Sequence, residues 1–349
     1  MRKLLVPFAL VIAACSNVVE DGSSPAACPP KASTSDLPGL GGSSALEEVT
    51  SFGANPGGLK MYVHAPAGKT PVAVVLALHG CTQSAADYVS AGWNEVADRE
   101  GLVIVYGEQQ SANNGMKCFR WWEPSQIGDG GEARSLANMV EAAHAKYGTK
   151  RAFVTGLSAG GAMTSVMLAA YPDVFEAGAV MAGLPYKCAT SQLDTYSCMS
   201  GRELSADEWA ALVPKASSAR APRVSIWQGD ADWTVRPVNR EELVKQWTRV
   251  NGISEEPTET KTEGPATHRI HRDAAGTVRV ESWAIPKMGH GVALDPKSGC
   301  GKAGAFALDV GVCSTEQASA FFLGASPRAG GGGGGGGPGS TGGAPDPCR

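Results

Sequence analysis

A tight turn around a serine constrains the fold of this chain more than any other feature. Residues 156–160 read Gly-Leu-Ser-Ala-Gly and lie between a short apolar run, 152–155, and a helical pattern, 159–170. Glycine on either side of the serine lets a strand and a helix approach each other without Cβ clashes. A G-x-S-x-G turn in this context presents the serine at the carboxyl edge of a sheet, beside helix N–H groups that favour negative charge. Ser158 is therefore the candidate nucleophile.

Short apolar runs alternate with helical patterns around this turn. Strands are predicted over residues 59–65, 72–78, 102–106, 152–155, 177–182, 223–228 and 278–285, and helices over 132–147, 159–170 and 238–250. The run at 72–78 is continuously apolar, which is typical of a strand buried on both faces. This alternation predicts the α/β class, with a mostly parallel central sheet and helices on both faces.

The two ends of the chain differ in composition from the middle. Residues 1–14 combine a basic start with a short apolar stretch, and residues 12–15 resemble a bacterial lipobox, so we expect a lipoprotein-type signal peptide and lipidation at Cys15. The alternative is a plain signal peptide cleaved nearby. Residues 15–44 are interpreted as a flexible tether and 326–349 as a Gly-rich disordered tail. Residues 45–325 are then one catalytic domain of an exported protein, extracellular or held at the cell envelope.

The net charge limits which partners the chain can bind, and the cysteine content indicates disulfides and not a metal site. The formal net charge is −4, which argues against nucleic acid, and membrane contact is expected only through the lipid at Cys15. The chain has nine Cys, so a lipidated Cys15 leaves eight, an even number that suits disulfides in an exported protein. No C-x-x-C pair occurs, and neither a metal nor an organic cofactor is expected.

A serine nucleophile needs a base and an acid, in the order Ser, acid, His for this kind of turn. His268, His271 and His290 follow Ser158. The first two lie in a polar, strand-like stretch and are interpreted as exposed strand residues, whereas His290 lies in a Gly-flanked loop after the strand at 278–285. For the acid, Asp230 and Asp232 both follow the strand at 223–228. We favour Asp232, because the chain must extend some way beyond the start of the turn before a carboxylate on it can reach the histidine.

The oxyanion formed during attack needs two N–H donors. The backbone N–H of Ala159 directly follows the nucleophile, and that of Cys81 lies in a turn after the strand at 72–78. His79, in the same turn, is interpreted as a support for the loop and not as a second base.

Ten stretches of the chain, in order, resemble the secreted PHB-depolymerase-type esterases, a family of α/β-hydrolases that also includes feruloyl and acetylxylan esterases. They lie at residues 78–83, 92–94, 118–121, 131–133, 156–163, 171–175, 182–186, 229–235, 289–296 and 300–313 and span about 240 residues. The resemblance implies an α/β-hydrolase fold and a triad of Ser158, Asp232 and His290. It also implies a serine carboxylesterase without cofactor, acting on esters of hydroxyalkanoate oligomers or polymer.

Two other functions stay open. One is a feruloyl or acetylxylan esterase acting on plant polysaccharide esters, and the other is an inactive binding module on a hydrolase scaffold. The chain departs from the family pattern at residue 107, where Gly replaces the common Pro, and at Phe119 and Arg120, where Trp and Asn are frequent. We expect Arg120 to alter the lip of the pocket, and Trp121 and Arg120 are candidate substrate-binding residues.

Three disulfides are expected. The family likeness implies a bridge between Cys81 and Cys118, whose loops follow strands at one sheet edge. Bridges Cys188–Cys198 and Cys300–Cys313 would each close a short loop, leaving Cys28 and Cys348 to pair or stay free.

Overall fold

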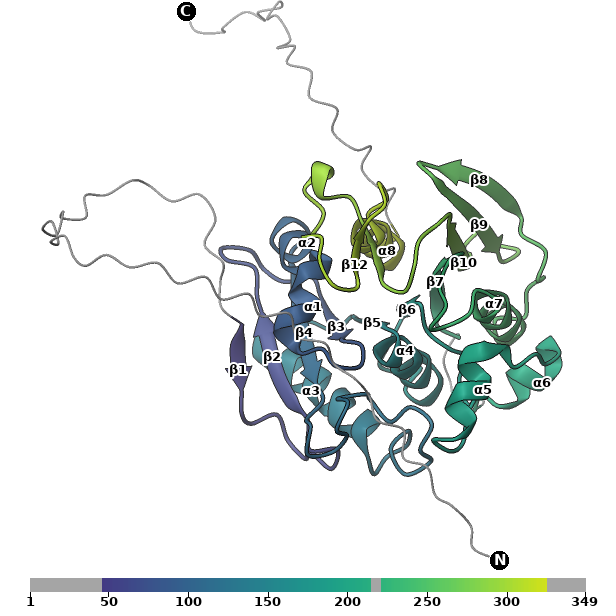
Figure 1. The fold of residues 1–349 in the computed structure, drawn as a ribbon. Helices are drawn as coiled ribbons and strands as arrows, with labels where there is room; N and C mark the ends of the chain where they lie inside the picture. The colour runs from purple at the N-terminus through teal and green to yellow at the C-terminus, as the bar shows by residue number, and fades with distance from the viewer. Residues whose placement is uncertain (1–45, 215–220, 325–349) are drawn as a thin grey trace, which may run out of the picture. The chain divides into compact units, whose positions relative to one another are not determined.

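A ten-stranded sheet forms the centre of the molecule. The computed structural model describes residues 46–214 and 221–324, and its sheet has the order β1-β2-β4-β3-β5-β6-β7-β10-β9-β8 (Figure 1). The central strands β4, β3, β5, β6, β7 and β10 run parallel, and the strands at both ends are antiparallel. The strands are β1 (Glu47–Val49), β2 (Lys60–His64), β3 (Ala73–Leu78), β4 (Leu102–Glu108), β5 (Ala152–Leu157), β6 (Ala177–Met181), β7 (Arg223–Gly229), β8 (Glu259–Glu263), β9 (Ala266–Arg272) and β10 (Val278–Ile285).

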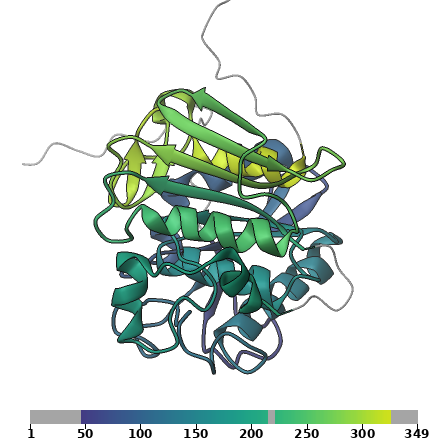
Figure 2. The same ribbon diagram turned by 90° about the vertical axis from the view of Figure 1, so that its right-hand side faces the viewer.

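Helices cover both faces of this sheet. They are α1 (Ala85–Tyr88), α2 (Trp93–Glu100), α3 (Glu132–Tyr147), α4 (Ala159–Ala170), α5 (Asp194–Gly201), α6 (Ala206–Ala211), α7 (Val238–Val250) and α8 (Ser314–Leu323), with 3₁₀ turns η1 (Val89–Ala91) and η2 (Pro296–Ser298). A separate parallel pair, β11 (Val292–Leu294) and β12 (Ala307–Asp309), lies beyond β10. Figure 2 looks onto the β8–β10 edge, with α7 lying against the green strands.

The core divides into two layers because side chains alternate along each strand. In β3, Val74, Leu76 and Leu78 join the cluster formed with α3, α4 and α7, whereas Val75 and Ala77 join the cluster formed with α2 and α8. All six residues of β3 are buried. A continuous apolar run is therefore needed here, since both faces of the strand are covered.

The predicted α/β-hydrolase architecture, a mostly parallel sheet with helices on both faces, is confirmed. Four elements have the bounds that the sequence predicts: the helices at 132–147, 159–170 and 238–250, and the strand at 278–285. The described residues belong to a single compact unit. The interpretation of His268 and His271 as exposed is wrong, since both are buried. The ring of His268 stacks on Trp283 between Glu263 and Glu281, and Nδ1 of His271 lies against the carbonyl of Ser254.

Several predictions made for the chain ends lie outside the described residues. These are the signal peptide at 1–14, the tether at 15–44 and the tail at 326–349, together with Cys15, Cys28 and Cys348. Among the residues that are described, no helix has the length and apolar character needed to cross a membrane.

Candidate active site

Ser158 occupies the sharp turn between β5 and α4. Its backbone has φ 58° and ψ −116°, a conformation that is costly for a residue with a Cβ. Two hydrogen bonds hold it: its N–H donates to the carbonyl of Met181 (2.9 Å), and its own carbonyl accepts from Ala162 (2.8 Å). Strain of this kind persists only where the surroundings enforce it, and it points the serine away from both flanking elements.

Glycine is required where the helix meets the neighbouring strand. A Cβ added to Gly160 would lie 2.3 Å from the carbonyl oxygen of Leu78 and 2.5 Å from that of His79. Gly156 faces the same restriction, since its Cβ would lie 2.4 Å from the Gly160 oxygen. The glycines of the motif therefore allow the first turn of α4 to sit directly against the end of β3.

His290 and Asp232 form an oriented pair beside this turn. Nδ1 of His290, in the loop between β10 and β11, lies 2.7 Å from Oδ2 of Asp232, which follows β7. The Asp232 carboxylate is buried and also accepts from the Nε2 amide of Gln228 (2.9 Å) and from the N–H groups of Thr234 (2.8 Å) and Val235 (2.9 Å). These four contacts fix the carboxylate, which in turn fixes the ring and leaves Nε2 of the imidazole to meet a substrate or nucleophile.

Asp230, the alternative acid, points elsewhere. Its side chain accepts a hydrogen bond from the backbone N–H of Lys287, so it ties the β7 turn to the β10–β11 loop. The geometry thus brings His290 together with Asp232 and not with Asp230.

Ser158 and His290 share one pocket of about 440 Å³. Its walls are apolar or neutral: no Asp, Glu, Lys or Arg lines it in the described chain. Its lining residues are Gly80, Cys81, Thr82, Gln83, Asn114, Met116, Cys118, Trp121, Trp122, Leu157, Ser158, Ala159, Leu184, Gln192, Thr195, Tyr196, Met199, Thr234, Val235, His290 and Phe306. Such a pocket suits a neutral ligand with apolar parts.

The turn after β3 contributes the other side of the pocket. Cys81 and Ala159 both line it, and neither of their backbone N–H groups donates a hydrogen bond within the described residues. His79 is buried and supports the turn: its Nδ1 bonds the Gly80 carbonyl (2.7 Å), and its Nε2 accepts from the N–H of Gln109 (3.1 Å). Burial lowers the pKa of His79, which keeps the ring neutral as this bonding pattern requires.

Three disulfides are present with the expected pairings: Cys81–Cys118, Cys188–Cys198 and Cys300–Cys313. The first has a direct bearing on the pocket, because it joins the turn after β3 to the long segment that follows β4. The N–H of Thr82 reinforces this junction by donating to the carbonyl of Met116 (2.6 Å).

Arg120 does not fulfil the role expected of it. It is absent from the pocket lining, and its guanidinium lies against Glu132 (2.8 Å) and Glu123 (3.5 Å). Glu132 is buried, and its carboxylate also binds the Gln109 side chain (2.7 Å), so Arg120 neutralises a buried charge. Arg120 therefore pairs with the buried Glu132 and does not line the pocket, whereas Trp121 does.

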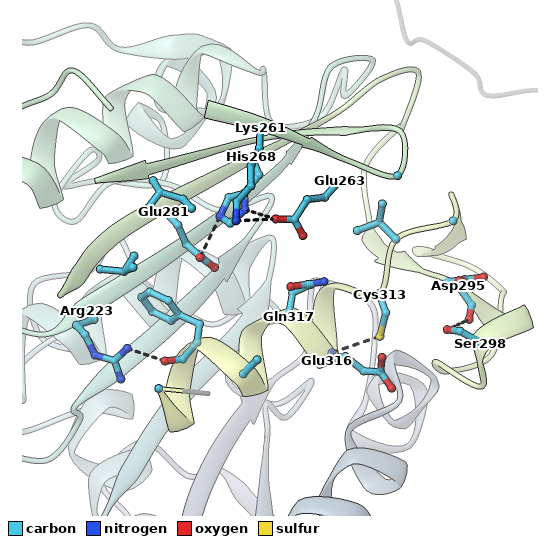
Figure 3. A pocket seen from close by; sticks show the side chains of 18 of the residues that line it. Arg223, Lys261, Glu263, His268, Glu281, Asp295, Ser298, Cys313, Glu316 and Gln317 are labelled. Carbon is cyan, nitrogen blue, oxygen red and sulfur yellow. Dashed lines mark hydrogen bonds and ion pairs between the residues drawn. The ribbon is translucent and has the colours of Figure 1, made fainter. Parts of the chain in front are cut away.

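A second, larger cavity of about 760 Å³ lies between α8 and the β8–β10 strands (Figure 3). Here His268 is held between Glu263 (3.0 Å) and Glu281 (3.1 Å), and its ring stacks on Trp283 at 3.7 Å. Both nitrogens of His268 are therefore occupied within the fold, and neither Ser158 nor its neighbours reach this cavity. Among the described residues no group of His, Cys, Asp and Glu is arranged to bind a metal.

Sequence reasoning missed two residues next to the candidate triad. Gln228, the penultimate residue of β7, supports Asp232; a glutamine directly after Ile226-Trp227 in a buried strand could have indicated it. Phe306 places its ring 6.2 Å from that of His290 in an edge-on arrangement, with its backbone at φ 60°. Nothing in the sequence around Phe306 indicates that contact.

The amino-acid sequence matches a known protein family and individual esterases. The family model described as Esterase PHB depolymerase matches residues 58–270. A poly(3-hydroxyalkanoate) depolymerase C from Paucimonas lemoignei is 45% identical over 289 residues, covering 80% of this chain and 70% of the relative. Feruloyl esterase B from Talaromyces stipitatus is 31% identical, covering 72% of this chain and 73% of the relative.

Solved structures agree on the architecture. An acetyl xylan esterase from Aspergillus awamori superimposes with a TM-score of 0.65 at 27% identity, covering 71% of this chain and 94% of that chain. The LpqC poly(3-hydroxybutyrate) depolymerase from Bordetella parapertussis has the same fold, with a TM-score of 0.50 at 18% identity over 82% of this chain and 92% of that one. The chain therefore belongs to the esterase PHB depolymerase family of α/β-hydrolases and is a carboxylic ester hydrolase.

Proposed function

We propose that Ser158, His290 and Asp232 are the catalytic triad of this esterase. The observation that carries the proposal is the 2.7 Å contact between His290 Nδ1 and Asp232 Oδ2 at the wall of the pocket that also holds the strained Ser158. With Nδ1 bound, Nε2 of His290 is the nitrogen available to take the proton from the serine hydroxyl.

The reaction then follows from the positions of the groups. The Ser158 oxygen attacks the ester carbonyl while His290 takes its proton, and the buried Asp232 carboxylate stabilises the imidazolium. The N–H groups of Cys81 and Ala159 bind the oxyanion. His290 returns the proton to the leaving alcohol, and water, deprotonated by the same imidazole, releases the acyl group from Ser158.

For the substrate we propose esters of hydroxyalkanoate oligomers or polymer. The support is twofold: the pocket walls carry no charge in the described chain, and the relative that is 45% identical is named a poly(3-hydroxyalkanoate) depolymerase. Trp121 is proposed to contact the acyl part, since it lines the pocket.

The alternative substrate class consists of hydroxycinnamoyl or acetyl esters of plant polysaccharide, because relatives at 31% and 35% identity are named feruloyl and acetylxylan esterases. The experiment that separates the two measures products from 3-hydroxybutyrate oligomers, methyl ferulate and acetylated xylan under the same conditions. We expect release of 3-hydroxybutyrate from the oligomers. Faster release of ferulate or acetate would replace the first proposal by the second.

We further propose that the protein is exported and anchored through a lipid on Cys15. Its support is the signal-like sequence at residues 1–15 and the presence of three disulfides, which persist in oxidising compartments. Cys15→Ala should release the protein from the membrane fraction or block its maturation. If fractionation of the Cys15→Ala protein matched that of the natural chain, the lipid anchor would be excluded.

A further inference from the structure

The loop between β11 and β12 carries an aromatic residue in a strained conformation. Phe306 directly precedes β12, and its backbone has φ 60°, in the left-handed region. It occupies the third position of a turn in which Gly304 and Ala307 exchange backbone hydrogen bonds (2.9 and 3.1 Å). Turns that need a positive φ at this position normally place Gly or Asn there. An aromatic residue takes up this conformation only where the surrounding structure enforces it.

Contacts with the segment that follows His290 enforce the conformation. The carbonyl of Phe306 accepts from the N–H of Val292 (2.9 Å), at the point where β12 pairs with β11. The two segments are so close that a Cβ added to Gly291 would lie 2.7 Å from the Phe306 carbonyl oxygen. Glycine is therefore needed at 291, and the backbone of Phe306 is held directly against the residues that follow His290.

The side chain of Phe306 lies against the imidazole of His290. The ring centroids are 6.2 Å apart and the ring planes meet at 80°, an edge-to-face arrangement that aromatic pairs prefer. The side chain of His290 is 11% exposed, whereas Phe306 is 39% exposed. The phenyl ring is thus the outer member of the pair.

The contact between His290 and Asp232 does not by itself fix the imidazole. It sets the position of one ring atom, Nδ1, at 2.7 Å from Oδ2. The ring could still tilt about that contact, and a tilt would move Nε2 away from Ser158. A displacement of about 1 Å in a reacting group can cost about 10²-fold in rate. Within the described residues, the aromatic ring that meets His290 and opposes such a tilt is that of Phe306.

We propose that Phe306 is a positioning residue that holds the His290 imidazole with Nε2 toward Ser158. The disulfide between Cys300 and Cys313 closes the loop that carries Phe306, so it helps to keep the phenyl ring in place. The inference rests on the proposed triad and adds a residue that acts through its base. A glycine at 306 would satisfy the backbone without strain but would leave the imidazole free to tilt. The ring contact therefore accounts for an aromatic residue at this position.

Two replacements separate the effect of the ring from that of the strain. Phe306→Ala removes the ring and keeps a Cβ at a positive φ, whereas Phe306→Gly removes the ring and relieves the strain. For p-nitrophenyl butyrate we expect kcat to fall about thirty-fold in both proteins, with KM within about three-fold of the natural value. Phe306→Gly should nevertheless melt at a higher temperature than Phe306→Ala. Phe306→Tyr keeps the ring and should retain kcat within about two-fold.

The matched control is Lys187, which has φ 57° and does not line the pocket. Lys187→Gly should likewise melt at a higher temperature than Lys187→Ala, but kcat should equal that of the natural chain in both proteins.

The disulfide is tested by a double-mutant cycle. Replacing Cys300 and Cys313 by Ser should lower kcat, and adding Phe306→Ala to that protein should lower it little further, because the bridge acts on His290 through Phe306. Losses of kcat that multiply would overturn the link between the bridge and the ring.

Labelling by a fluorophosphonate probe gives a second readout, since it needs Ser158 activated by an aligned base. The labelling rate should fall in Phe306→Ala and Phe306→Gly alike. Unaltered kcat and labelling in both proteins, with thermal melts confirming that they are folded, would overturn the proposal. So would a rise in KM alone, or activity that recovers in Phe306→Gly together with the melting temperature. Full activity in His290→Ala would instead refute the proposed triad, whatever the behaviour of the Phe306 variants.

Discussion

The side-chain amide of Gln228 donates to Oδ2 of Asp232 at 2.9 Å, the same oxygen that Nδ1 of His290 contacts. The same amide also donates to the carbonyl of Val235 (2.9 Å), so Gln228 spans the turn that carries the acid. Its other atom, Oε1, is buried without a hydrogen-bond partner in the described chain. Gln228 therefore acts on the site as a positioning residue that holds the carboxylate.

Replacing Gln228 by Leu should lower kcat by about ten-fold, the effect of losing roughly one hydrogen bond to a charged group. KM should stay within about two-fold, because Gln228 does not line the pocket. Steady-state kinetics on a soluble ester, with thermal melts to confirm folding, make the measurement. A fall in thermal stability with kcat unaltered would assign Gln228 a structural role only.

Changes to the proposed triad test its membership directly. Ser158→Ala, His290→Ala and Asp232→Asn should each reduce kcat/KM for p-nitrophenyl butyrate by about 10⁴. Asp230→Asn is the matched control, since Asp230 binds the Lys287 backbone and not His290. A fluorophosphonate probe should label the natural chain and not Ser158→Ala. If Asp230→Asn were crippling and Asp232→Asn mild, the acid would be misassigned.

The Cys81–Cys118 disulfide should affect catalysis more than stability. Replacing both cysteines by Ser opens a loop with a sequence separation of 37 residues, and loop entropy predicts a loss of about 3–4 kcal/mol in unfolding free energy. In addition, the Cys81 N–H would no longer be held toward the oxyanion, so kcat should fall at a temperature where the protein is still folded.

The control for that experiment is the double replacement of Cys188 and Cys198. These cysteines carry no oxyanion donor and do not line the pocket, but Thr195 and Tyr196 within their loop do. Their removal should therefore lower the melting temperature and raise KM, while kcat falls less than on loss of the Cys81–Cys118 bridge. Non-reduced peptide mapping gives an independent check: a free, alkylatable Cys81 in the active enzyme would contradict the bridge.

The long helices and central strands were predictable because local signals mark them. The helix at 132–147 ends at Gly148, which takes a left-handed conformation, and the helix at 238–250 ends at Asn251-Gly252. The short helix α5 carried no such signal: it reads Asp-Thr-Tyr-Ser-Cys-Met-Ser-Gly, which has few strong helix formers, and it is tied to the fold by the Cys188–Cys198 bridge.

The candidate triad was predictable for a different reason, namely that motif and chain order restrict the choice to a few residues. Its surroundings were not. Phe306 lies beside His290 only because the connection between β11 and β12 comes close to the loop between β10 and β11, and the spacing of residues in the sequence does not indicate that contact. The misplacement of Arg120 has the same origin, since its partner Glu132 is buried at the start of α3.

Acid should destabilise the fold through buried histidines. His271 is buried, its Nε2 lacks a hydrogen-bond partner within the described residues, and burial lowers its pKa below the ordinary value of 6.5. Burial lowers the pKa of His79 and His144 in the same direction. Below about pH 6.5 the unfolded chain therefore binds protons at these sites that the folded chain does not, and the free energy of unfolding falls as pH falls.

The contribution of His271 can be isolated with His271→Gln, which keeps a polar side chain but cannot titrate. The free energy of unfolding, from urea titrations at about pH 7.5, 6.5 and 5.5, should fall less steeply with acid in this protein than in the natural chain, by at most about 1.4 kcal/mol per pH unit for one proton. Glu132 works in the opposite sense, because burial raises its pKa above 4.5. Proton uptake by the folded chain at Glu132 therefore offsets part of the loss at the acid end of the range. Parallel pH slopes in the two proteins would show that His271 takes up its proton without unfolding, and the argument from its burial would fail.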